Sequence, residues 1–118
     1  MRLPLLVLLG SGIGGLLRFW VGTWLPSATF PWATLLVNLL GSFAIGAAAS
    51  GLAADQAGAR AFAMAGVCGG FTTFSAYSLQ TLELLQGGRA AAAGAYAAGS
   101  VVGCLIATWS GWALLRAI

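Results

Sequence analysis

Four apolar stretches fill nearly the whole chain, and each is close to the length of about 20 residues that a helix needs to cross a bilayer. They lie at about residues 2–25, 32–52, 61–85 and 90–115. Of the 118 residues, 60% are hydrophobic and 6% are charged, whereas about a quarter of the residues of a soluble domain are charged. The sequence therefore predicts an all-α, multi-pass membrane protein, in which residues 1–118 form one four-helix transmembrane domain within the lipid bilayer.

The connections between these stretches are short. Residues 25–32 contain two prolines and predict a turn, residues 53–60 form a hydrophilic loop, and residues 86–89 form the last turn. A signal peptide is the competing interpretation of the first stretch, because Arg2 precedes a leucine-rich run. That run has no A-x-A cleavage site, which favours a spanning helix.

The third stretch carries a predicted interruption at Gly69–Thr73. Paired glycines followed by two threonines are a poor helix interior, since Gly costs about 1 kcal/mol relative to Ala and Thr hydrogen-bonds readily to the local backbone. Within hydrocarbon, an interrupted backbone is tolerated only where it is buried in protein or lines a wet cavity. We therefore expect an ion or solute to be held at this break.

Polar side chains gather on either side of the predicted break. Thr34, Asn38 and Ser42 recur four residues apart on the second stretch, either to hydrogen-bond a neighbouring helix or to line a solute pathway. After the break, Phe74 and Tyr77 share one helix face, with hydroxyl-bearing residues beside them. Hydrogen-bond donors and the positive edges of aromatic rings suit an anion.

The charged residues are few and scattered. The first two stretches contain no carboxylate, and Glu83 lies near the end of the third. Arg18 lies late in the first stretch. Its side chain either reaches the lipid headgroups or places a fixed positive charge in a pore vestibule, at the mouth of an anion route. Arginines are almost evenly divided between the two predicted sides of the membrane, a bias so small that the chain could insert in both orientations.

Several functional classes are disfavoured by composition. The chain has no His, and Cys68 and Cys104 lie in apolar runs without metal-ligand spacing, so that we expect neither a zinc site nor an enzyme. The scattered arginines do not form the basic face that nucleic-acid binding requires. Glycines recur four apart at Gly10 and Gly14, at Gly66 and Gly70, and at Gly99 and Gly103, a spacing that predicts closely packed helices.

Three segments together resemble the signatures of the Fluc family of fluoride channels. They are Gly14–Phe19, Trp32–Phe43 and the run from Gly66 to Ser75 that contains Gly69-Gly70-x-Thr72-Thr73-Phe74. The resemblance covers the whole chain in order. It implies a passive, fluoride-selective channel that lowers cytoplasmic fluoride, assembled as an antiparallel, dual-topology homodimer in the bacterial inner membrane.

The resemblance also implies roles for individual residues. Asn38 matches the pore asparagine, Thr34 a pore hydroxyl and Phe74 the first ring of an aromatic pair, whose second member is Tyr77 here in place of Phe. Gly69 and Thr72 match positions whose backbone carbonyls hold a structural sodium ion at the dimer interface. The predicted pore and fluoride residues are thus Asn38, Phe74, Tyr77, Thr34, Ser42, Thr73 and Ser75, with Arg18 at the vestibule.

Two other interpretations remain open from the sequence. A small proton-coupled multidrug exporter would need Glu83 as its proton-exchanging carboxylate. A structural membrane subunit would transport nothing. The fluoride-channel hypothesis predicts instead that substitution of Asn38 or Phe74 abolishes fluoride flux while the dimer stays intact.

Overall fold

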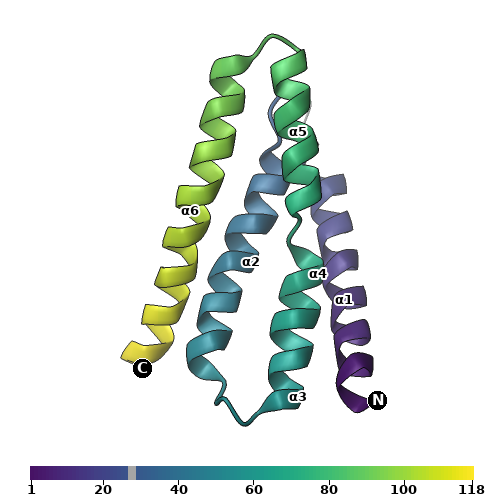
Figure 1. Ribbon diagram of the computed structural model, residues 1–118, viewed down its shortest axis with the longest axis vertical. Helices are drawn as coiled ribbons and strands as arrows, with labels where there is room; N and C mark the ends of the chain where they lie inside the picture. Colours follow the sequence, from purple (N-terminus) through teal and green to yellow (C-terminus); the bar gives the residue numbers. More distant parts are fainter. Residues whose placement is uncertain (27–28) are drawn as a thin grey trace.

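A computed structural model describes residues 1–26 and 29–118, so positions 27 and 28 of the predicted first turn lie outside the described residues. The described chain is helical and elongated, with extents of 49 × 31 × 21 Å (Figure 1). Its elements in order are α1 (Arg2–Trp24), α2 (Trp32–Gly51), α3 (Ala57–Arg60), the π-helix η1 (Ala61–Cys68), α4 (Gly69–Phe71), α5 (Phe74–Gln86) and α6 (Ala90–Ala117).

Three of these helices, α1, α2 and α6, are long and apolar enough to cross a membrane. This finding confirms the predicted class of the protein, an all-α membrane protein. The third predicted stretch is divided among α3, η1, α4 and α5, which follow one another along the length of the molecule in Figure 1. No single helix of this segment reaches spanning length, because the backbone leaves the helical conformation part-way along.

The predicted break is present, and it is narrower than expected. Gly69 and Gly70 are helical, contrary to the prediction that the paired glycines interrupt the helix, and only Thr72 (ψ 160°) and Thr73 (φ −150°, ψ 113°) are extended. The Thr72 hydroxyl donates to the Cys68 carbonyl at 2.9 Å, and the Thr73 hydroxyl accepts from the Ala76 N–H at 3.2 Å as the N-cap of α5. The threonines therefore make the break, because their hydroxyls offer alternative partners to the backbone.

Glycines bring α1 into backbone contact with the segment before the break. A Cβ on Gly10 would lie 2.9 Å from the Gly66 Cα, and a Cβ on Gly70 would lie 2.9 Å from the Ser11 Cα. A second contact joins α2 to α6, where Gly46 meets the Thr108 backbone. Two of the three predicted glycine spacings thus meet each other directly, whereas Gly99 faces open space.

The buried core is small. Its largest fully buried side chains are Tyr96 (1% exposed) and Val37 (2% exposed), and Tyr96 packs with Leu84 and Ala93 between α5 and α6. Large apolar side chains are exposed on every long helix, as expected for surfaces that face lipid or another chain.

Candidate functional site

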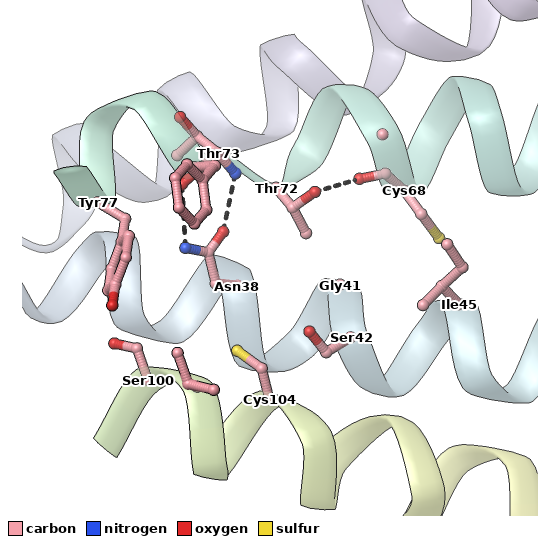
Figure 2. Close-up of a pocket in the computed structure, with 13 residues that line it drawn as sticks. Asn38, Gly41, Ser42, Ile45, Cys68, Thr72, Thr73, Tyr77, Ser100 and Cys104 are labelled. Carbon is pink, nitrogen blue, oxygen red and sulfur yellow. Dashed lines mark hydrogen bonds between the residues drawn. The ribbon is translucent and has the colours of Figure 1, made fainter. Parts of the chain in front are cut away.

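A cavity of about 300 Å³ lies beside the helix break, between α2 and α6 (Figure 2). We call it the break cavity. Its lining residues come from α2, from the segment on both sides of the break, and from α6. They are Asn38, Gly41, Ser42, Ile45, Cys68, Gly69, Thr72, Thr73, Phe74, Tyr77, Ser100, Val101 and Cys104.

Asn38 holds the break open. Its Nδ2 donates to the Thr73 carbonyl at 3.1 Å, and its Oδ1 accepts from the Thr73 N–H at 2.8 Å (Figure 2). The amide side chain thereby takes the place of the helical backbone partners that Thr73 lacks, and one amide N–H remains for another acceptor. Asn38 is therefore a structural clamp as well as a cavity-lining donor, a double role that the sequence pattern did not show.

Hydroxyl groups line the cavity from two helices. Ser42 faces it from α2, and Ser100 faces it from α6. The Ser100 side chain is only 5% exposed, and its hydroxyl oxygen is the one buried side-chain polar atom among the described residues that has no hydrogen-bond partner. Buried polar groups normally have a partner, so this hydroxyl is available to something inside the cavity. The four-residue spacing of Ser100 and Cys104 on α6 was the only sequence signal for it.

Phe74 and Tyr77 follow the break on α5 and line the same cavity. Their ring centroids are 5.2 Å apart with a tilt of 50°. The Phe74 side chain is 75% exposed, which is high for a ring beside a cavity. The Tyr77 hydroxyl donates to the Ala97 carbonyl at 2.9 Å, so its proton ties α5 to α6.

Three predicted site residues do not line the cavity. Thr34 is 7% exposed and lies outside the lining of the cavity. Ser75 is exposed, and its hydroxyl lies 3.3 Å from that of Thr73. Arg18 is partly buried on α1 and lines neither this cavity nor the pocket described next.

A second pocket, of about 240 Å³, lies near the connection between α5 and α6. We call it the end pocket. Figure 1 shows this connection at the end of the bundle opposite the two termini. Its lining residues are Thr29, Phe30, Pro31, Gln80, Glu83, Leu84 and Arg89.

Residues 5–112 match the model of a family described as CrcB-like protein, Camphor Resistance (CrcB). The chain belongs to the CrcB-like family. Three of its relatives are each named fluoride-specific ion channel FluC. The protein of Paramagnetospirillum magneticum is 51% identical and covers 90% of this chain and 89% of its own length. The protein of Methylocella silvestris is 46% identical and covers 95% of this chain and 92% of its own length. The protein of Thermus thermophilus is 48% identical and covers 93% of this chain and 91% of its own length.

These similarities confirm the family resemblance predicted from the three sequence segments. Because the matched region includes both α2 and the helix break, the break cavity lies within the part of the chain that this CrcB-like protein shares with its relatives.

Proposed function

We propose that this protein is a fluoride-specific ion channel that lets fluoride leave the bacterial cytoplasm passively across the inner membrane. The observation that carries the proposal is its similarity, over about nine-tenths of the chain, to proteins named fluoride-specific ion channels. The break cavity adds support, because none of its lining residues is a carboxylate that would repel an anion.

The cavity supplies the chemistry that fluoride needs. A small, strongly hydrated anion must exchange its water for hydrogen-bond donors that hold it weakly enough for release. The free amide N–H of Asn38 and the hydroxyls of Ser42 and Ser100 are such donors. The rings of Phe74 and Tyr77 offer positive edges beside them.

The complete channel in this proposal is an antiparallel homodimer, each chain crossing the membrane four times. The segment from α3 to α5 is the third crossing, with its interrupted backbone lining the cavity. The exposed Phe74 ring and the 21 Å short dimension of the molecule support a second copy, because one thin chain does not enclose a wet route by itself. The near balance of arginines between the two sides permits opposed insertion.

A structural sodium ion at the dimer interface belongs to the same proposal, held by the carbonyls of Gly69 and Thr72. In an uninterrupted α-helix the Thr73 N–H would donate to the Gly69 carbonyl, whereas here it donates to Asn38. The freed carbonyl is a hard oxygen ligand of the kind that suits such a cation. If this assignment holds, the purified dimer melts at a lower temperature in choline chloride than in sodium chloride, and equal melting temperatures would exclude it.

Efflux from reconstituted liposomes tests the function. Vesicles loaded with potassium fluoride should release fluoride once valinomycin is added, while matched vesicles loaded with potassium chloride stay tight. The release should need no proton gradient, which separates a channel from a proton-coupled exporter. Fluoride retention equal to that of protein-free vesicles would refute the proposal.

The exposed ring offers a sharp variant for the same assay. Phe74→Leu removes the aromatic edge at a position that is 75% exposed in the single chain, so the chain fold should survive. We expect fluoride release to be lost. Leu82→Ala, at another exposed apolar position of α5, is the matched control and should release fluoride as the unchanged protein does.

A further inference from the structure

Two cysteines line the break cavity, and the proposed ion route uses neither of them. Cys68 is the last residue of η1 and Cys104 lies on α6, so the two side chains come from different walls of the cavity (Figure 2). Both are free thiols. Cys68 is only 6% exposed, whereas Cys104 is partly exposed. The cavity therefore presents one accessible thiol and one buried thiol.

The cavity is polar at the turn of α6 that carries Cys104. Ser100 lies four residues earlier on the same helix face, and Figure 2 shows both side chains directed from α6 toward α2 and the break. The Ser100 side chain is 5% exposed, and its hydroxyl oxygen has no hydrogen-bond partner within the described chain. Because a buried hydroxyl normally has a partner, Ser100 points to a polar occupant of the space beside Cys104.

Water fits both this space and these polar groups. A water molecule takes up about 30 Å³ in the liquid and needs about two to four polar partners, and the cavity measures about 300 Å³. Ser42 and Ser100 supply hydroxyls, and Asn38 supplies the amide N–H that its bonds to Thr73 leave free. Water held by these groups reaches the wall of the cavity that Cys104 forms.

Hydration decides which of the two thiols reacts. The nucleophile is the thiolate, which forms where water solvates the sulfur and is suppressed by burial in apolar surroundings. Cys104 meets the polar cavity next to Ser100, whereas the Cys68 side chain is almost closed off. Cys104 is therefore the reactive nucleophile of the break cavity.

We propose that Cys104 is a covalent modification site for small, uncharged, thiol-reactive electrophiles, and that a group attached there closes the break cavity to fluoride. The closure rests on the proposed fluoride-channel function, whereas the reaction at the sulfur does not. Cys104 lines the same space as the donors Asn38 and Ser100. An added group consequently occupies the volume that the ion and its water need.

Propyl methanethiosulfonate is a suitable reagent because it is small and uncharged, so that it reaches the cavity from either side of a bilayer. The Cys104 thiol gives its proton to water, and the thiolate attacks the propyl-bearing sulfur of the reagent. A disulfide bond forms between Sγ and that sulfur, the S–S bond of the reagent breaks, and methanesulfinate leaves with the electron pair. Dithiothreitol later reduces the mixed disulfide and restores the thiol.

The reaction is measured first, on the purified full-length protein in mildly alkaline buffer. Peptide mass spectrometry follows the gain of the propylthio group at each cysteine. We expect Cys104 to react at least about tenfold faster than Cys68, because the accessible thiol forms its thiolate more readily. The melting temperature of the modified protein should equal that of the untreated protein.

Fluoride efflux from liposomes measures the closure. Treatment should lower the rate of the unchanged protein at least about tenfold, since the added group fills space at the site of passage. Dithiothreitol should restore the rate. Each cysteine variant is compared with its own untreated sample. Cys104→Ala should keep its rate after treatment, and Cys68→Ala, the matched control from the other wall, should lose its rate as the unchanged protein does.

Each contrary result has a different meaning. Addition at Cys68 in preference to Cys104, or at neither, overturns the modification site. Full modification of Cys104 with an unchanged efflux rate overturns the closure. A fall in rate that comes with a lower melting temperature also overturns it, because the group then disturbs packing and does not simply fill the cavity. Untreated protein that releases no fluoride refutes the channel function, while the mass measurement still decides whether Cys104 reacts.

Discussion

The two sides of the broken helix are packed in opposite ways. On one side, η1 and α4 meet α1 through glycines, with backbone against backbone and no room for an added methyl group at Gly10 or Gly70. On the other side, α2 meets the break through the Asn38–Thr73 hydrogen bonds and through Gly41 against Thr72, and a cavity of about 300 Å³ lies beside these contacts, lined by the break, α2 and α6. The comparison shows how one helix can be firmly supported in lipid while its polar backbone remains accessible, because close packing on one face leaves the other face free to line a cavity.

The largest effect should come from removing the Asn38 side chain, which clamps Thr73 beside the break cavity. Asn38→Ala leaves both the N–H and the carbonyl of Thr73 without their partners, and each buried unpaired group costs about 1–3 kcal/mol. We expect loss of fluoride flux together with a marked fall in melting temperature. Ser42→Ala, one turn further along α2, should keep the melting temperature. Full flux and unchanged melting in Asn38→Ala would show that the clamp is dispensable.

The second-largest effect should be a loss of stability when the contact between Gly10 of α1 and Gly66 of η1 is disturbed. Gly10→Ala places a methyl group 2.9 Å from the Gly66 Cα, where only backbone could yield, so we expect a loss of about 1–3 kcal/mol. Gly12→Ala faces open space on the same helix and is its matched control. Unfolding in a detergent titration compares the two. Equal destabilisation would mean that close packing at Gly10 does not support the broken helix.

Substitution of Ser100 should lower fluoride flux without lowering the stability of the protein. Its buried hydroxyl has no partner within the described chain, so Ser100→Ala removes no intramolecular hydrogen bond and should leave the melting temperature unchanged or higher. If the hydroxyl donates to the ion in transit, flux should fall about fivefold, the equivalent of about 1.0 kcal/mol. Ser110→Ala, nearer the C-terminal end of α6 and outside the lining of the break cavity, is the control and should leave flux unchanged. A lower melting temperature with normal flux would assign Ser100 to packing alone.

The smallest effect is expected at Tyr77. Tyr77→Phe removes one hydrogen bond to the Ala97 carbonyl, worth about 0.5–1.5 kcal/mol, and keeps the ring against Phe74. Melting should fall slightly while fluoride flux stays within about twofold. A large loss of flux would contradict this prediction and indicate that the hydroxyl itself meets the ion.

The break also shows how far local sequence rules extend. The pattern Gly69-Gly70-x-Thr72-Thr73 correctly indicated an interruption, but attributed part of it to glycines that remain helical. Glycine weakens a helix by only about 1 kcal/mol, which the tight contact of Gly70 with Ser11 outweighs. The threonines interrupt the helix because Asn38, from another helix, supplies the partners that Thr73 gives up.

The sequence by itself determined the class of protein, the neighbourhood of the break and the family, because apolar length, local backbone preferences and short motifs are properties of adjacent residues. Tertiary structure decided which polar residues share a space. It brought Ser100 to the break cavity, left Thr34 outside it and placed Arg89 rather than Arg18 at a pocket. These choices depend on how each helix is rotated and packed against helices distant in sequence, and no spacing along one helix specifies that rotation.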